Sequence, residues 1–242
     1  MTSKKTLVAL QFNYEKKSLE DNFKTLKRLM NRTTENSIVL APELCLSGYK
    51  YDSLQDSAEF SKKILTELKE LSTCKTFALT LIEEEKGNYF NNLKIFHNGN
   101  LIQTRAKAKL FPLGDEEKFF TSGETKDINI IEIDGIKIAT LVCFELRFTE
   151  LWQQIKGADI ILVPSFWGKL RKEHLKILSE ALGVANQAFV IVANSSDEEM
   201  ASSSAIITPF GDIYRDDSSF IVTHNVDLNE IEKMRRYIKI GL

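Results

Sequence analysis

Hydrophobic residues in the first third of the chain recur in two spacings, one typical of buried strands and one of helices. Short apolar runs at 7–12 and 38–41 predict strands. Hydrophobic residues elsewhere in this third return every three or four positions among charged ones, which predicts two amphipathic helices. The positions are Leu19, Phe23, Leu26 and Met30 for the first helix, and Phe60, Ile64, Leu65, Leu68 and Leu71 for the second. Ser18 precedes the first helix and can cap it.

The middle of the chain is richer in strand patterns, and helices return toward the end. Asn98-Gly99 and Asp134-Gly135 are hairpin-turn signals, and each lies between two short apolar runs. Strands at both ends alternate with helices, which predicts one α/β domain with two sheets packed face to face and helices outside. The predicted strands are 77–82, 92–97, 101–105, 128–133, 136–142, 160–163, 189–193, 205–208 and 220–226, and the predicted helices are 148–155, 171–186 and 228–237.

The composition narrows the class of protein. The chain has 242 residues, of which 43% are hydrophobic, so it can bury a sizeable core. Its net charge of −2 gives no general attraction to nucleic acid. No apolar run approaches a membrane span, and the run at 7–12 is too short for a signal peptide, so we expect a cytoplasmic protein without membrane partners.

Cysteine and histidine usage carries two further expectations. The three cysteines, Cys45, Cys74 and Cys143, are too few and odd in number for a disulfide framework. The three histidines, His97, His174 and His224, are scattered without partners at ligand spacing, so we expect no metal site.

Three reactive side chains follow directly on apolar strands. Glu43 follows the strand at 38–41, Lys107 follows the strand at 101–105, and Cys143 follows the strand at 136–142. Ligands in α/β folds bind at the carboxyl ends of strands, so these side chains could converge there. A thiol with an ordinary pKa of about 8.5 is mostly protonated at neutral pH. A neighbouring lysine favours the thiolate, a carboxylate can accept the thiol proton and later activate water, and the N–H of Phe144 can help lysine to stabilise an oxyanion.

Each residue alone also has an ordinary structural interpretation. Cys143 at the end of a strand could be an inert core residue, and Glu43 could be a turn residue or a helix cap. Lys107 lies between Arg105 and Lys109, and such clusters are usually solvated. Spacing and composition alone do not decide between these interpretations and a catalytic site.

The local sequences around the three residues resemble the motifs of the nitrilase, or carbon–nitrogen hydrolase, superfamily. The segment from Ala41 reads A-P-E-L-C-L-S-G-Y and resembles the family pattern P-E-x-x-x-x-G-Y. The segment from Lys107 reads K-A-K-L-F-P and resembles K-x-H-L-F. The segment from Cys143 reads C-F-E-L-R-F-T-E-L and resembles C-Y-D-x-R-F-P-E-L. The motifs occur in the family order, and weaker matches downstream extend the resemblance over nearly the whole chain.

The resemblance implies a fold, a reaction and an assembly. The fold would be a four-layer α-β-β-α sandwich forming a single domain over residues 1–242. The reaction would be hydrolysis of a small amide through a thioester on Cys143, with Glu43 as base, Lys107 as cation, and no cofactor or metal. Family members form homodimers or higher homo-oligomers.

The resemblance also selects among neighbouring residues. Lys107 and Lys109 would point to the same face of a strand, and the distance to the following Leu110 selects Lys107. A second acidic residue beyond the lysine is expected to be Glu116, with Asp115 and Glu117 as close alternatives. The sequence departs from the family at Arg105, where a tyrosine is usual, and at Phe144, which replaces the tyrosine after the cysteine.

The substrate is the least determined part of this interpretation. The residues expected to line the pocket are Phe144, Ser165, Phe166 and Trp167, although Phe166 and Trp167 fit equally well as core residues. The same triad would also serve nitriles, N-carbamoyl compounds or acyl transfer. Two alternatives of other classes are a non-catalytic interaction protein with the same fold, and a Cys–His enzyme that uses His174 or His224.

Overall fold

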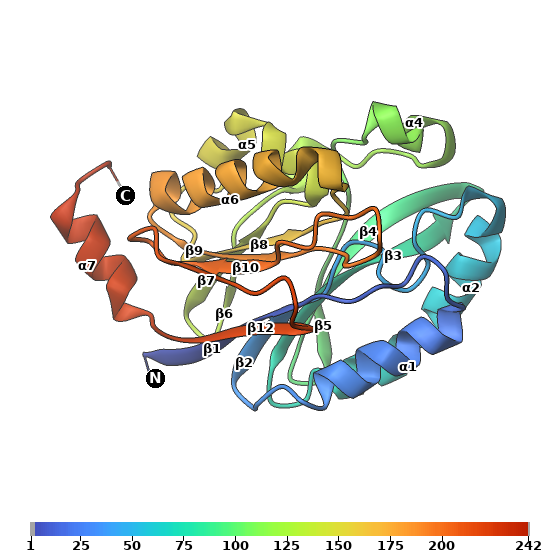
Figure 1. Cartoon of the computed structure of the whole chain (residues 1–242), viewed down its shortest axis with the longest axis horizontal. Helices are drawn as coiled ribbons and strands as arrows, with labels where there is room; N and C mark the ends of the chain where they lie inside the picture. Colours follow the sequence, from blue (N-terminus) through green and yellow to red (C-terminus); the bar gives the residue numbers. More distant parts are fainter. Residues whose placement is uncertain (1–2, 242) are drawn as a thin grey trace.

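Two six-stranded sheets form the centre of the molecule, and helices cover their outer faces (Figure 1). The computed structural model describes residues 3–241. The strand order in the first sheet is β12 (Ile221–Asp227), β1 (Lys4–Leu10), β2 (Ser37–Leu40), β3 (Thr76–Glu85), β4 (Asn88–His97) and β5 (Asn100–Ala106). The order in the second sheet is β11 (Ile213–Arg215), β10 (Ala205–Ile207), β9 (Phe189–Ala193), β8 (Ile160–Pro164), β7 (Ile136–Thr140) and β6 (Ile131–Ile133).

Parallel strand pairs occupy the middle of each sheet, and antiparallel pairs the edges. The parallel pairs are β1–β2 and β2–β3 in the first sheet, and β7–β8 and β8–β9 in the second. A parallel pair needs a crossover, and here each crossover contains helices. These helices are α1 (Leu19–Met30), α2 (Leu54–Lys63), α3 (Leu65–Leu71), α5 (Thr149–Gln154) and α6 (Lys172–Asn186). The remaining helices are α4 (Glu116–Phe119), α7 (Asn229–Tyr237) and the 3₁₀ turns η1 (Tyr51–Ser53), η2 (Pro112–Gly114), η3 (Thr125–Asp127), η4 (Cys143–Arg147) and η5 (Lys169–Arg171).

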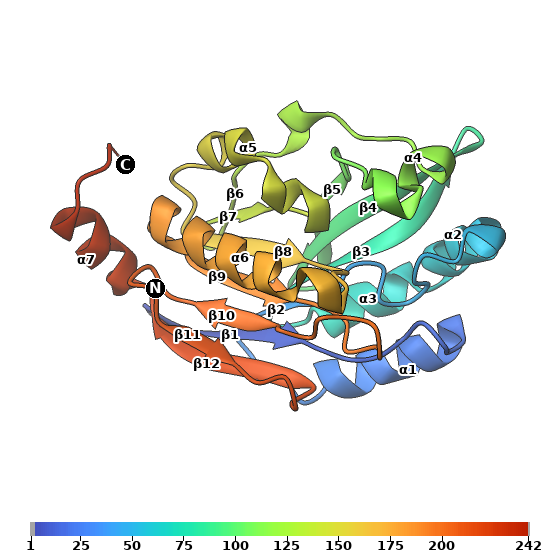
Figure 2. The same ribbon diagram turned by 45° about the horizontal axis from the view of Figure 1, so that its top comes forward.

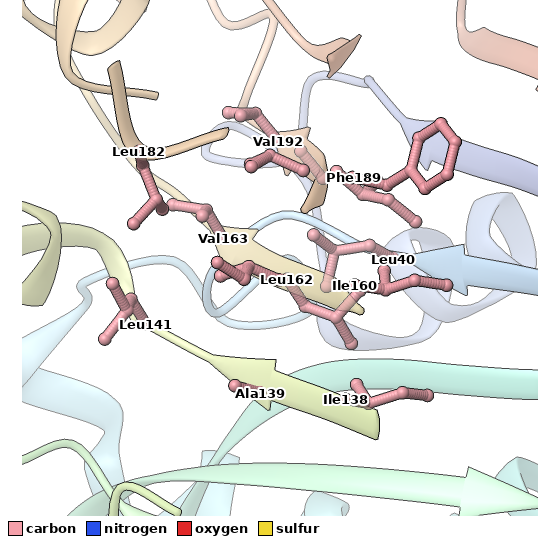
Figure 3. Close-up of a cluster of buried hydrophobic side chains, with 14 of the residues drawn as sticks. Leu40, Ile138, Ala139, Leu141, Ile160, Leu162, Val163, Leu182, Phe189 and Val192 are labelled. Atoms are coloured by element: carbon pink, nitrogen blue, oxygen red, sulfur yellow. The ribbon is translucent and has the colours of Figure 1, made fainter. Parts of the chain in front are cut away.

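Alternation along the buried strands produces two hydrophobic layers. Leu7 and Ala9 of β1 point between the sheets, whereas Val8 and Leu10 point toward α1 and its neighbouring helices. The larger cluster lies between the sheets and continues onto the helix-covered face of the second sheet (Figure 3). Figures 1 and 2 show α5 and α6 over the second sheet and α1 on the far side of the first. The four-layer sandwich is therefore confirmed.

The structure confirms the turn and cap signals. Asn98, Gly99, Asp134 and Gly135 all have the left-handed φ values that tight hairpin turns require. The Ser18 side chain accepts a hydrogen bond from the backbone N–H of Asp21 at the start of α1.

Three predicted elements were wrong in extent. The single helix predicted around 60–71 is two helices, because the backbone at Ile64 leaves the helical conformation. The strand predicted at 128–133 begins only at Ile131, because η3 occupies the chain just before it. The strand predicted at 136–142 ends at Thr140, since Val142 donates its N–H to the Glu145 carboxylate and Cys143 adopts a left-handed φ of 49°.

The predicted domain extends slightly beyond the residues that the structure describes. The ends of the predicted 1–242 domain, residues 1–2 and 242, lie outside the described residues. Within residues 3–241, no helix is long and apolar enough to cross a membrane.

Candidate active site

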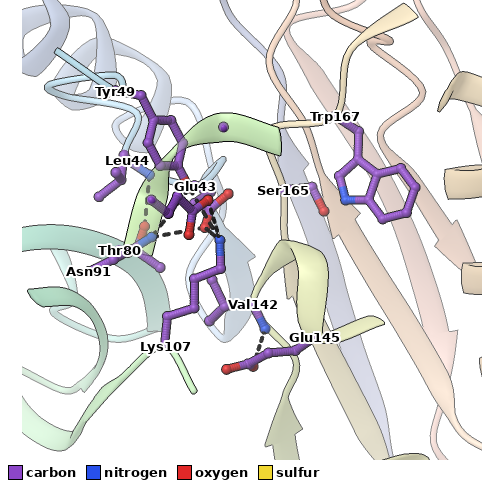
Figure 4. Close-up of polar contacts among 12 residues, drawn as sticks. Glu43, Leu44, Tyr49, Thr80, Asn91, Lys107, Val142, Glu145, Ser165 and Trp167 are labelled. Carbon is purple, nitrogen blue, oxygen red and sulfur yellow. Dashed lines mark hydrogen bonds and ion pairs between the residues drawn. The ribbon is translucent and has the colours of Figure 1, made fainter. Parts of the chain in front are cut away.

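Glu43 lies just beyond the carboxyl end of β2, held by contacts to both sheets. Its backbone N–H donates to the Ser165 carbonyl of the second sheet at 3.2 Å, and its carbonyl accepts from the Tyr14 hydroxyl at 2.7 Å. Its side chain is fully buried. Oε1 accepts hydrogen bonds from Asn91 and Lys107, both at 2.9 Å (Figure 4). The other oxygen, Oε2, is buried and has no hydrogen-bond partner among the described residues.

Lys107 follows β5 and is also fully buried. Its N–H donates to the Asn91 carbonyl, and its own carbonyl accepts from the N–H of Gly123, both at 2.8 Å. A Cβ at Gly123 would lie 2.5 Å from the Ala106 carbonyl oxygen, so only glycine allows the chain to return this close to the lysine. The ammonium donates to Glu43 at 2.9 Å and to Glu116 at 2.8 Å.

Glu116 is the acidic residue that the structure brings to Lys107. It begins α4 and is 3% exposed. Asp115 instead pairs with the exposed Lys118 at 3.0 Å, and Glu117 lies on the outer surface of the same loop. Of the three acidic candidates, Glu116 alone contacts the lysine.

Cys143 begins the short η4 turn after β7. Its left-handed φ of 49° costs a non-glycine residue about 1–3 kcal/mol, which the surrounding contacts must offset. The charges of Glu43, Lys107 and Glu116 all act on the thiol, so it lies near these three groups. The N–H of Phe144 lies in the first turn of η4, where backbone donors have no acceptor within the helix. The structure therefore brings Glu43, Lys107, Glu116 and Cys143 together.

The buried charges set the protonation of the cluster. Burial raises the pKa of the Cys143 thiol well above its ordinary value; Glu43 raises it further, and Lys107 opposes the change. Burial lowers the pKa of the Lys107 ammonium, but the charges of Glu43, of the Cys143 sulfur once it ionises, and of Glu116 outweigh burial and raise it. Burial also raises the pKa of Glu116, against the opposing effect of Lys107. At neutral pH the thiol is therefore protonated beside a carboxylate that can accept its proton.

A small pocket opens from Cys143 toward solvent. Its lining is aromatic and cationic: Phe111, Cys143, Phe144, Arg147, Phe166, Trp167 and Arg171. We expected Phe144, Phe166 and Trp167 to line the pocket, and all three do so. Ser165 is not among the lining residues; its hydroxyl donates to the Val163 carbonyl, and its own carbonyl holds the backbone of Glu43.

Two guanidinium groups in this pocket were not singled out from the sequence. Arg147 lies over the Trp167 ring at 4.5 Å, and Arg171 lies over the Phe111 ring at 5.2 Å. Burial and then the like charge of Arg171 lower the pKa of Arg147. Within residues 3–241 neither guanidinium forms an ion pair with a carboxylate, although both line the pocket. Arg147 could have been singled out from the sequence, because it lies within the cysteine motif, four residues after Cys143.

The other cysteines and histidines lie in different surroundings. Cys45 is fully buried, and burial raises the pKa of its thiol. His174 is 3.1 Å from a guanidinium nitrogen of Arg147, and His224 stacks on Tyr214. Glu43 is the charged group that shifts the pKa of the Cys143 thiol most, which favours a carboxylate over a histidine as its base. No cluster of three or more potential metal ligands occurs in the described part of the chain.

Comparisons with known proteins identify the family of the chain. Residues 6–236 match the family model described as carbon-nitrogen hydrolase. The chain is 28% identical to 2-oxoglutaramate amidase of Bacillus subtilis, over 97% of this chain and 95% of the relative. It is 29% identical to a Staphylococcus aureus protein named hydrolase in agr operon, over 87% and 85% of the two chains.

The fold is also shared with solved structures. Saccharomyces cerevisiae Nit3, a member of branch 10 of the nitrilase superfamily, superposes with a TM-score of 0.85 at 22% identity, covering 99% of this chain and 96% of Nit3. At this identity the likeness concerns the fold. Taken with the family match over residues 6–236, it confirms the sequence resemblance. The chain therefore belongs to the carbon–nitrogen hydrolase family.

Proposed function

We propose that the protein is an amidase in which Cys143 is the nucleophile, Glu43 the base and Lys107 the cation. The observation that supports this most strongly is the buried Lys107 ammonium, which bonds the carboxylates of Glu43 and Glu116 at 2.9 and 2.8 Å, in a cluster whose charges also act on the Cys143 thiol. Glu43 accepts the thiol proton as sulfur attacks the amide carbon. The resulting oxyanion is stabilised by the Lys107 ammonium and the Phe144 N–H.

The second half of the reaction reuses the same groups. Glu43 returns its proton to the leaving nitrogen, the C–N bond breaks, and ammonia or an amine departs. The remaining thioester is attacked by water, whose proton Glu43 accepts. The C–S bond then breaks as the acid forms, and Glu43 returns the proton to the sulfur. Glu116 holds Lys107 in place from the other side at 2.8 Å.

The pocket favours a substrate that carries a carboxylate as well as an amide. Arg147 and Arg171 place two positive charges beyond the nucleophile, and the lining contains no acidic side chain to neutralise them. Guanidinium groups bind carboxylates through paired, charge-assisted hydrogen bonds. We therefore infer that the substrate is a monoamide of a dicarboxylic acid. Two relatives bear compatible names, 2-oxoglutaramate amidase of Bacillus subtilis and omega-amidase NIT2 of Danio rerio.

The pocket also disfavours an ammonium group on the substrate. Trp167 lines the pocket, and its buried indole N–H has no acceptor among residues 3–241. Together with the two guanidinium groups, it offers donors and positive charge. A 2-oxo group can accept these hydrogen bonds, whereas a 2-ammonium group would meet like charge. The inferred preference is for 2-oxo acid or plain dicarboxylate monoamides over glutamine or asparagine.

A substrate panel scored for ammonia release tests this proposal. It would contain a 2-oxo dicarboxylate monoamide, the matching 2-amino compound, a neutral alkyl amide and a nitrile. We expect turnover to be fastest for the first, with activity lost in Cys143→Ala. A Cys143→Ala variant with full activity would exclude the nucleophile, and equal turnover of the neutral and anionic amides would exclude the carboxylate site.

Self-association is a further proposal. Ile177 and Val184 on α6 are 60% and 46% exposed, and Phe210 in the adjoining turn is 48% exposed. Such a patch is typical of a protein interface. We expect a homodimer of the 242-residue chain in the cytoplasm, and sedimentation velocity of wild type and Ile177→Asp tests the dimer.

A further inference from the structure

A second buried ion pair lies beside the proposed catalytic cluster. Glu145 is fully buried, and Arg105 is 6% exposed. The two Nη atoms of Arg105 donate to the two carboxylate oxygens of Glu145 at 3.0 and 2.8 Å. This paired geometry is the most directional form of an arginine–carboxylate contact. Neither side chain lines the pocket at Cys143, so the pair acts without touching a substrate.

The Glu145 carboxylate also binds backbone groups on either side of the site. Oε1 accepts the N–H of Ala108 at 2.7 Å. Oε2 accepts the N–H of Val142 at 2.6 Å, as Figure 4 shows. Ala108 directly follows Lys107, and Val142 directly precedes Cys143. One carboxylate thus connects the two chain segments that carry the ammonium and the thiol.

Arg105 completes the connection from the other direction. It lies two residues before Lys107 on β5, and it also donates to the Thr140 carbonyl at the end of β7 at 2.8 Å. β5 and β7 belong to different sheets, so no strand ladder fixes their ends relative to each other. Side-chain contacts must therefore set the distance between them.

The local backbone at Cys143 makes such a connection necessary. Its left-handed φ is unfavourable for a residue with a side chain, and the strand ladder of β7 has already ended at Thr140. The Glu145 carboxylate bonds the residue just before the turn, and the backbone N–H of Glu145 closes the turn onto Val142 at 3.0 Å.

We propose that the Arg105–Glu145 pair is a positioning device that fixes the Cys143 turn against the Lys107 segment. The proposal rests on the function assigned above to Cys143 and Lys107. It also gives a role to Arg105, one of the positions at which this sequence departs from the family pattern. Neither residue exchanges a proton with substrate; both act through the placement of the thiol.

A graded series of variants tests the proposal. Arg105→Lys keeps the charge but loses the paired geometry, and Arg105→Gln loses both. Because a displacement of about 1 Å can reduce turnover about 100-fold, we expect kcat to fall about 10-fold in Arg105→Lys and about 100-fold in Arg105→Gln. KM for a monoamide should stay within about threefold, since the pocket lining is intact.

Alkylation of Cys143 provides a readout that needs no substrate. Lys107 is the neighbour whose charge lowers the pKa of the Cys143 thiol. If Arg105→Gln lets the two groups separate, the thiolate fraction at pH 8 falls. We expect iodoacetamide to label Cys143 about tenfold more slowly, measured at peptide level in a Cys74→Ser background because Cys74 is exposed.

Lys94→Gln is the matched control. Lys94 on the neighbouring strand is 4% exposed and pairs with Glu83 at 2.9 Å, but Thr104, which it also contacts, lies on the face of β5 opposite Arg105. We expect Lys94→Gln to lower the melting temperature by about as much as Arg105→Gln does. Its kcat and its rate of Cys143 alkylation should stay within about twofold of wild type.

Two results would overturn the positioning role. One is an Arg105→Lys variant that folds and keeps wild-type kcat and alkylation rate. The other is a Lys94→Gln control that has the same melting temperature as an Arg105 variant and loses as much of its kcat and of its alkylation rate. If Arg105→Gln does not fold, Arg105→Lys decides alone. Activity retained in Cys143→Ala would refute the proposed function instead, and the alkylation comparison would still report on the positioning.

Discussion

The buried cluster of Glu43, Lys107 and Glu116, called the floor below, and the arginine-bearing lining of the pocket at Cys143, called the mouth, handle charge in opposite ways. At the floor, the Lys107 ammonium contacts two carboxylates, those of Glu43 and Glu116, and all three groups are buried. At the mouth, Arg147 and Arg171 rest on aromatic rings and form no ion pair in the described part of the chain. Charge at the floor is compensated within the protein, whereas charge at the mouth is available to a ligand.

This difference indicates which of the two regions does which task. Compensated, buried charges hold fixed positions, and fixed positions suit proton transfer and oxyanion stabilisation. Uncompensated cations attract an anion and give it a preferred orientation. Substitutions at the floor should therefore lower kcat, and substitutions at the mouth should raise KM.

The largest effect is expected for Glu43→Gln. This variant removes the base, so kcat should fall about 10²- to 10⁴-fold. The negative charge of Glu43 raises the pKa of the Cys143 thiol, so its removal should lower that pKa. Alkylation of Cys143 by iodoacetamide should consequently reach half its maximal rate at a lower pH than in wild type. Unchanged hydrolysis, or a shift of the alkylation curve to higher pH, would contradict the proposed role of Glu43.

The next effect concerns the mouth. Arg147→Gln should raise KM for a carboxylate-bearing monoamide about 10- to 100-fold, because a hydrogen bond to a charged group contributes about 1.5–3 kcal/mol. KM for a neutral alkyl amide should change little, which serves as the internal control. Initial-rate kinetics on both substrates measure the difference. An equal rise for the two substrates would mean that Arg147 supports the pocket wall and does not bind an anion.

A smaller effect is expected at the second carboxylate of the floor. Glu116→Gln leaves Lys107 with Glu43 as its one carboxylate partner and should lower kcat about tenfold, equivalent to about 1.4 kcal/mol. Glu117→Gln, on the outer surface of the same loop, is the control and should retain full activity. The assignment of the second acidic residue is wrong if the two variants behave alike in steady-state assays.

The smallest effect is expected for Trp167→Phe. It keeps an aromatic ring under Arg147 but removes the indole N–H, so kcat/KM for a 2-oxo monoamide should fall about three- to tenfold. A plain dicarboxylate monoamide, which lacks the oxo group, should be affected less. Equal losses on the two substrates would show that the indole N–H does not distinguish them.

The sequence predicted the layers of the fold and the buried cluster at the floor better than the arginines at the mouth. The layers follow from alternation: Leu7 and Val8 face opposite sides of one strand, and both sides are buried, which is what a sheet between two hydrophobic layers requires. Glu43 and Cys143 were singled out because each follows a buried strand, but the choice of a catalytic over a structural role needed the family resemblance. Lys107 needed the family resemblance to separate it from Lys109.

The mouth could not be predicted for a physical reason. Arg147 and Arg171 lie on two different short turns, η4 and η5, which carry no periodic pattern. Whether an arginine at the surface is solvated or faces a pocket depends on how those turns pack. The same limit explains the strand end at Thr140, since the turn at Cys143 is held by the distant Arg105 and by Glu145, contacts that local propensity does not contain.

The central claim is that the sulfur of Cys143 carries the acyl group of the substrate during turnover. Intact-mass spectrometry of acid-quenched wild-type enzyme, mixed with a 2-oxo dicarboxylate monoamide, tests it most directly. We expect a fraction of the protein to gain the mass of the acyl group, located on the peptide that contains Cys143, and no such species in Cys143→Ala. Hydrolysis at the wild-type rate without any adduct in Cys143→Ala would contradict the claim, as would an adduct on another residue.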